Sequence, residues 1–297
     1  KVRRRSSSGK LLHTKKWILP LRLFCLAFCA PMLPHSYAET PIISPWRPLR
    51  PGMELIETKI HEGFLFSTTI TAVRASPHYF RPKVFRASEF GPPSNSAKNI
   101  CKLSGASACI NANFFDEQRR PLGAVISRGI IHKKLHRKGG TLTGVFVTTK
   151  DSFFIVHRSD FSPNNVLEAF QAGPRLISDG KSITGIKTTS AQGALSILCI
   201  VESENIILAK VALSLFTRYP SHIQEALRKA PFKCFQALNL DGGSSSQLFA
   251  SGASLSAEPL PETALDSPGR DVVPVIFALI PVSSPPQAKT PELNAAK

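Results

Sequence analysis

Several signatures that would assign a function directly are missing from this sequence of 297 residues. No two cysteines form a CxxC pair, which argues against a zinc site. Glycine-rich dinucleotide and P-loop motifs are absent too. There is no internal repeat, and basic residues are not interleaved with aromatic ones in any known module, so we expect no nucleic-acid partner. No apolar run reaches the roughly 20 residues of a membrane span.

Acidic residues are also missing from the N-terminal 38 residues, where eight basic residues precede an apolar core at Leu23–Leu33. Ser36 and Ala38 then stand at the two positions that a signal peptidase reads. This layout predicts a secretion signal over residues 1–38 and a periplasmic or secreted protein with no stable membrane span. An anchored N-terminal helix is the alternative, although the apolar core is short for it.

Removal of the signal lowers the formal net charge from +17 to +9, with 29 Lys and Arg against 20 Asp and Glu. A moderately basic surface favours anionic substrates or an anionic envelope. We divide the remaining chain by composition into a proline-rich lead-in (39–59), a domain (60–282) and a disordered tail (283–297).

The domain shows mostly strand signals. Phe64–Val73 predicts one strand, and apolar runs around short polar turns predict three hairpins, at residues 124–132, 144–156 and 194–211. Only two helices are expected: Ser221–Ala230, capped by Ser221 with Gln224 at the capping-box spacing, and a shorter one at Asn165–Phe170. The pattern predicts a single α+β domain with a mainly antiparallel or mixed sheet.

Four cysteines remain after the signal, and an exported chain can join them into up to two disulfides. Cys101 and Cys109 are close enough to close a small loop. Cys199 and Cys234 lie in apolar runs and fit buried thiols equally well, so the pairing stays open.

Three segments carry polar residues that differ from ordinary scaffold. Asn111 and Asn113 alternate on an apolar run and share one face of a strand, where they either bind a ligand or satisfy turn backbone. Arg175 follows a Gly-Pro turn and offers a planar fork for carboxylate or phosphate. The stretch 237–252, ALNLDGGSSSQLFASG, ends a strand at Asp241 and then exposes backbone N–H groups that can form an anion-binding concavity.

Together these segments are far more specific. The order INANFFD, PLG, QAGPRLI, ALNLDGGSSSQL and GRDVVPV resembles the phosphodiester glycosidase domain family, in particular its exported bacterial branch, from about Ile60 to Ile280. Ser244 stands where the family has a third glycine. Thr188 and Thr189 stand where the family commonly has an arginine.

The resemblance implies hydrolysis of a sugar-1-phosphodiester in an envelope or extracellular glycan. It implies Asp241 as the main catalytic carboxylate and Asp116 as the best second one. The substrate-binding residues that it implies are Asn111, Asn113, Arg175, Gly242, Gly243, Ser244, Ser245 and Arg270.

Three other interpretations stay open. No cofactor is required, but Asp241, Asp116 and the asparagine oxygens could ligate Ca²⁺. The chain could instead be a non-catalytic protein that binds a glycan or anionic polymer of the envelope. A purely structural envelope protein is the third interpretation.

Overall fold

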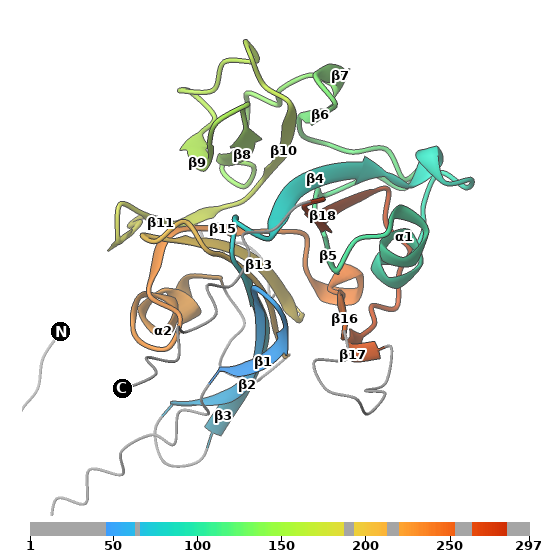
Figure 1. Ribbon diagram of the computed structural model, residues 1–297. Helices are drawn as coiled ribbons and strands as arrows, with labels where there is room; N and C mark the ends of the chain where they lie inside the picture. Colours follow the sequence, from blue (N-terminus) through green and yellow to red (C-terminus); the bar gives the residue numbers. More distant parts are fainter. Residues whose placement is uncertain (1–45, 63–65, 187–192, 213–219, 253–262, 284–297) are drawn as a thin grey trace, which may run out of the picture. The chain divides into compact units, whose positions relative to one another are not determined.

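The computed structural model describes residues 46–62, 66–186, 193–212, 220–252 and 263–283. The predicted signal (1–38) lies outside these ranges, as does the predicted tail apart from Ser283. The described chain is mostly β-sheet with a few short helices, so a mainly β description fits it as well as the expected α+β class (Figure 1). All strand pairings between the named strands are antiparallel.

The strands form three sheets. Sheet I has eight strands, in the order β1 (Arg47–Arg50), β2 (Met53–Glu62), β3 (Phe66–Ala75), β14 (Ile206–Val211), β13 (Leu195–Val201), β15 (Cys234–Asn239), β11 (Arg175–Ser178) and β12 (Lys181–Ser182). Sheet II has five, in the order β7 (Ile130–Lys133), β6 (Val125–Ser127), β10 (Glu168–Ala172), β8 (Gly144–Thr148) and β9 (Phe153–His157). Sheet III has five, in the order β17 (Thr263–Ser267), β16 (Leu248–Ser251), β5 (Ala108–Asn111), β18 (Val275–Pro281) and β4 (Phe80–Arg86).

The three predicted hairpins are confirmed as β6–β7, β8–β9 and β13–β14. Each pairs two runs rich in β-branched or aromatic residues across a short polar turn, the arrangement that favours local antiparallel pairing. The predicted strand at Phe64–Val73 corresponds to β3. The predicted domain start at residue 60 falls inside β2, so the strand residues of the lead-in belong to sheet I.

The helix predictions agree less well with the structure. The helix expected at Asn165–Phe170 is wrong: this region contributes strand β10, which pairs with β6 and β8. Tertiary strand pairing overrides the weak local helix propensity there.

Near Ser221 the chain forms a 3₁₀ turn, η2 (Pro220–Ile223), followed by α2 (Gln224–Arg228), whose N-cap is Ile223 with no side-chain cap. The predicted capping box is therefore wrong. The side chain of Gln224 instead donates to the carbonyls of Leu176 and Ile183 in and after β11. No helix in the described part of the chain is long and apolar enough to cross a membrane.

The three sheets share one hydrophobic core. Leu198 and Leu238 enter it from sheet I, Phe146 and Phe170 from sheet II, and Phe277 from sheet III. The rings of Phe146, Phe170 and Phe277 pack against one another with centroids 4.9 to 5.7 Å apart. Aromatic pairs at such distances contribute ~1 kcal/mol each beyond the area that they bury. The site described below thus rests on a rigid, buried junction.

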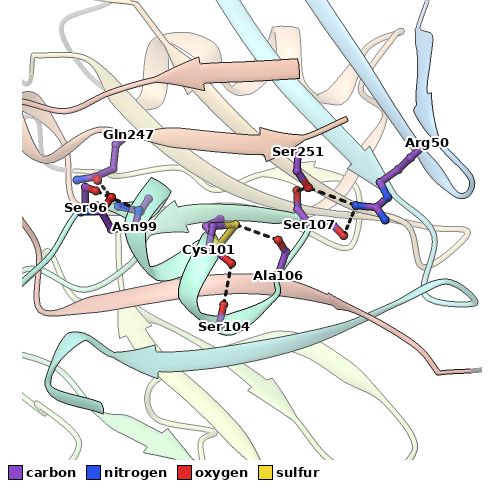
Figure 2. Close-up of a disulfide and its surroundings, with 11 residues drawn as sticks. Arg50, Ser96, Asn99, Cys101, Ser104, Ala106, Ser107, Gln247 and Ser251 are labelled. Atoms are coloured by element: carbon purple, nitrogen blue, oxygen red, sulfur yellow. Dashed lines mark hydrogen bonds between the residues drawn. A yellow bond between two sulfur atoms is a disulfide. The ribbon is translucent and has the colours of Figure 1, made fainter. Parts of the chain in front are cut away.

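Two disulfides link the described cysteines, and they settle the pairing that the sequence leaves open. Cys101, on α1 (Ala97–Ser104), joins Cys109 on β5, and Cys199 on β13 joins Cys234 on β15. Figure 2 shows the first bridge and, beside it, the Arg50 guanidinium donating to the hydroxyls of Ser107 and Ser251, at 2.7 and 3.3 Å. The second bridge lies within sheet I and fixes two neighbouring strands.

Candidate active site

Asp241 lies where the chain leaves one sheet for another. Strand β15 of sheet I ends at Asn239, and the chain continues through Asp241-Gly242 and the 3₁₀ turn η3 (Gly243–Ser245) into β16 of sheet III. Gly243 has a φ of +65°, a conformation that residues with a side chain rarely adopt. Gly193 comes so close that a Cβ on it would lie 2.8 Å from the Gly243 Cα. The glycines therefore permit a tight, crowded loop.

Hydrogen bonds to three neighbouring segments hold the backbone of this loop. The Asp241 N–H donates to the Ala112 carbonyl (3.1 Å), and the Gly243 N–H donates to the Ala194 carbonyl (2.7 Å). The side chain of Asn111 donates to the Asp241 carbonyl (2.7 Å). Segments from sheets I and III thus clamp the loop from both sides.

The carboxyl group of Asp241 is half-buried and strongly perturbed. Its pKa is raised from 3.8 to about 6, mainly because burial disfavours the charged form, and the nearby charge of Asp271 raises it further. Hydrogen bonds from the Ser245 side chain and from the Gly242 N–H (3.0 Å) favour the ionised form and partly offset the shift. A carboxyl that titrates close to neutral pH is suited to proton transfer or nucleophilic attack.

Asp271 is a second carboxylate at the Asp241 loop, and our sequence reasoning missed it. Its Oδ2 accepts a hydrogen bond from the Ser244 hydroxyl, and its N–H donates to the Ser244 carbonyl (3.1 Å). The Gln247 side chain donates to the Asp271 carbonyl (3.1 Å). The residue stands inside the GRDVVPV motif, between the two residues that carried the resemblance, so an acid within that motif was the available signal.

Ser244 thus contacts the second carboxylate, at the position where the family has a third glycine. Its hydroxyl forms a hydrogen bond that glycine cannot provide. The backbone N–H groups of Gly242, Gly243 and Ser245 are already bonded within the protein. In this structure these N–H groups donate to protein acceptors, whereas the sequence suggests that they bind an anion.

The two asparagines of the predicted site are fully buried. The Asn111 Oδ1 accepts from the Ser196 hydroxyl (2.7 Å) and from the Gln247 N–H (3.0 Å), while its Nδ2 donates to Asp241. Asn113 donates to the carbonyls of Ala124 and Gln171, at 3.1 and 3.0 Å. In this structure both amides bond mainly to backbone, and Asn111 positions Asp241.

Arg175 lines a pocket of about 210 Å³ together with Thr143 and His157. It begins β11 opposite Leu238, and Gly144 makes room for its stem, since a Cβ there would lie 2.6 Å from the Arg175 Cγ. Burial lowers the pKa of this half-buried guanidinium, and its Nε has no hydrogen-bond partner among the described residues. A planar cation with an unused donor suits a carboxylate or phosphate ligand.

Of the remaining predicted site residues, Asp116 has no hydrogen bond to the Asp241 loop among the described residues, whereas Arg270 is joined to that loop through its backbone. Asp116 forms a turn: its carboxylate accepts from the N–H groups of Gln118 and Arg120 and pairs with the Arg120 guanidinium at 2.8 Å. The hydrogen bond from the Arg120 backbone is the main cause of its lowered pKa. No hydrogen bond between described residues joins Asp116 to Asp241. Arg270 is exposed, and its N–H donates to the Ser244 carbonyl (2.8 Å).

The described residues contain no group of three or more His, Cys, Asp or Glu side chains that could hold a metal ion. The described residues therefore give the Ca²⁺ hypothesis no additional support. It stays a hypothesis for the test by chelation.

Comparison with known proteins identifies the family. The sequence model of the phosphodiester glycosidase family matches residues 104–278, more than half of the chain, so this chain belongs to the phosphodiester glycosidase family. The match confirms the resemblance carried by the asparagine, Gly-Pro and Asp-Gly-Gly motifs.

Solved structures show a similar fold. The catalytic domain of zebrafish N-acetylglucosamine-1-phosphodiester alpha-N-acetylglucosaminidase, auto-inhibited by its pro-peptide, is 16% identical over 80% of this chain and 86% of that chain, with a TM-score of 0.56. A hypothetical protein from Synechocystis is 17% identical over 77% of this chain and 62% of that chain, with a TM-score of 0.50. Identities this low show a shared fold alone. No curated protein matches the sequence significantly.

Proposed function

We propose that this protein is an exported glycosidase that hydrolyses the bond between a sugar and the phosphate of a sugar-1-phosphodiester. An envelope or extracellular glycan is the proposed source of the substrate. The observation that carries the proposal is the crowded loop of Asp241, in which the Asp241 carboxyl accepts from the Gly242 N–H and the Ser244 hydroxyl donates to the Asp271 carboxylate. Membership of the phosphodiester glycosidase family supports the reaction class.

The chemistry suits a site with one perturbed carboxylate. A phosphodiester oxygen is a good leaving group and needs little protonation, so the main demand is to stabilise positive charge that develops on the sugar. Asp241 is ionised above pH 6 and faces the anomeric carbon in this proposal, as nucleophile or as base for a water molecule. Asp271 is the second carboxylate, in place of Asp116, because Asp271 alone of the two interacts with Asp241.

Arg175 is the proposed ligand for the phosphate. Leu238, its partner across the sheet, precedes Asp241 by three residues, which supports a common site for Arg175 and Asp241. The pocket that Arg175 lines leaves room for an anionic group beside the guanidinium. Asn111 is assigned a positioning role, because its amide holds the Asp241 loop.

Export is supported by the disulfides. Two disulfides among the described residues fit an oxidising compartment, where such bonds form and persist. The basic segment followed by an apolar core at residues 1–38 is consistent with the same destination.

The proposal is tested by incubating the protein with a panel of chromogenic sugar-1-phosphodiesters that differ in the sugar. We expect release of free sugar from at least one member and a loss of at least ~100-fold in kcat for Asp241→Asn. Asp116→Asn is the matched control, since it removes a carboxylate from a turn outside the Asp241 loop, and it should retain activity. Turnover by Asp241→Asn at the wild-type rate would refute the assignment.

The same panel separates the enzyme from the alternative binding protein. If calorimetry detects binding of a sugar-1-phosphate polymer while no member of the panel is turned over, the chain is a glycan-binding protein on a glycosidase fold. Addition of a chelator during the assay tests the Ca²⁺ hypothesis: a loss of activity or of thermal stability would support it.

A further inference from the structure

One surface of sheet II is strongly basic and lies outside the proposed active site. Residues 118–150 contain eight Lys and Arg and no acid. Half of these charges fall on edge strand β7 and the segment after it, and Arg128 directly precedes the strand. We call residues 128–138, with sequence RGIIHKKLHRK, the basic edge. Figure 1 shows β7 at the end of the sheet, next to β6.

The basic edge is exposed and its charges are largely unpaired. Lys133, Lys134, Arg137 and Lys138 are exposed, and none of them makes an ion pair with a described residue. Arg128 alone within the edge pairs with an acid, Glu89, at 3.0 Å. Four neighbouring cations without counter-charges create a positive potential that attracts an anionic partner.

Apolar side chains are exposed among these cations. Ile130 and Ile131 are 60% and 52% exposed. Beside them lies a groove of about 320 Å³, lined by apolar side chains such as Leu135 and Phe161 and by the cations Lys133, Lys134 and Arg137. Lysine on an edge strand commonly prevents pairing with another sheet. That role explains Lys133 but not two adjacent exposed isoleucines.

We propose that the basic edge docks the protein on the surface of an anionic lipid bilayer. Lys and Arg beside an anionic membrane each strengthen binding, and apolar side chains among them enter the boundary between headgroups and acyl chains. A water-soluble polyanion would match the charges, but it would leave Ile130, Ile131 and the apolar groove without a partner. The mixture of both kinds of side chain therefore favours the bilayer.

The experiment uses the full chain and vesicles of phosphatidylcholine with or without phosphatidylglycerol, at physiological salt. Binding is measured by co-sedimentation and located by hydrogen exchange. We expect binding that requires phosphatidylglycerol and slower exchange within residues 128–138. The hydrogen-exchange readout separates this surface from the basic segment at residues 1–38, which is present in every variant.

Three variants complete the test. Lys133→Glu combined with Lys134→Glu and Arg137→Glu should weaken binding to phosphatidylglycerol vesicles about 100-fold, at roughly fivefold for each cation removed. The matched control reverses three exposed lysines outside the edge, Lys59, Lys102 and Lys181, and should keep the protection of residues 128–138. Ile130→Ser with Ile131→Ser should weaken vesicle binding while leaving binding to soluble polyphosphate unchanged. Circular dichroism verifies that each variant is folded.

Two results would overturn the proposal. The first is equal vesicle binding and equal protection of residues 128–138 by wild type and by the edge variant. The second result has two parts. The isoleucine variant binds vesicles as tightly as wild type does, and the wild-type protein binds polyphosphate as tightly as it binds vesicles. That second pattern would assign the edge to a polyanion. Neither result depends on hydrolysis, so the proposed activity is tested separately.

Discussion

Replacement of Asp241 by asparagine is expected to stabilise the fold while it lowers the rate of the proposed hydrolysis at least ~100-fold. The raised pKa means that the ionised carboxylate is less favourable in the folded chain than in the unfolded one. Asparagine has nearly the same shape, carries no charge, and its Oδ1 can still accept the hydrogen bond from the Gly242 N–H. The variant therefore removes a desolvated charge with little change in packing.

The magnitude follows from the two pKa values. The pKa of Asp241 is 3.8 in the unfolded chain and about 6 in the folded one. At ~1.4 kcal/mol per pKa unit, ionisation of this carboxyl lowers the free energy of unfolding by up to about 3 kcal/mol. The stability contributed by the protonated carboxyl is fully present below pH 3.8 and is lost as the pH rises through about 6. The weaker hydrogen bond that an amide accepts from Ser245 reduces the gain to about 2 kcal/mol.

Urea unfolding at pH 4 and pH 8 measures this effect. We expect Asp241→Asn to exceed wild type in the free energy of unfolding by about 2 kcal/mol at pH 8 and by less than about 1 kcal/mol at pH 4. Asp116→Asn is the control of opposite sign, because the pKa of Asp116 is lowered and its charged form stabilises the turn. A gain of the same size at both pH values, or a loss at pH 8, would refute the reasoning.

Three further predictions concern the supports of the site. Asn111→Ala leaves the Gln247 N–H and the Ser196 hydroxyl without their acceptor and should lower the free energy of unfolding by about 3–5 kcal/mol; a loss below 1 kcal/mol would contradict its positioning role. Arg175→Lys should raise KM about tenfold with kcat within roughly threefold, and a change in kcat alone would speak against phosphate binding. Replacing both cysteines of the Cys199–Cys234 bridge, which spans 35 residues, should lower the free energy of unfolding by about 4 kcal/mol. Replacing both cysteines of the Cys101–Cys109 bridge, which spans 8 residues, should lower it by about 2.5 kcal/mol. A larger loss from the Cys101–Cys109 replacement in urea unfolding would contradict this order.

Local patterns in the sequence predict the hairpins well. Strands β8–β9 and β13–β14 are confirmed because each pair is adjacent in sequence and its turn is visible between two apolar runs. The helix expected at Asn165–Phe170 fails because β10 gains its partners from β6 and β8, which are distant in sequence. Local propensity contains no information on such partners.

Local sequence likewise marks some residues of the candidate site and not others. The Asp-Gly-Gly segment marks Asp241 from the sequence, since glycine next to an acid at the end of a strand is locally unusual. Asp271 reaches it from a segment 30 residues further along the chain, and no spacing rule connects the two. Burial of Asn111 can be anticipated from its apolar neighbours, but the carbonyl that it holds cannot, because that contact crosses 130 residues.

The loop of Asp241 depends on contacts with residues 111–112, 194–196 and 269–271. No single stretch of this chain contains all of these contacts, so the proposed site can form only when the folding of both sheets is complete. Under the proposed function, an unfolded chain would be inert, and a fragment released by proteolysis would be inert as well. Activity would then be a direct readout of finished folding.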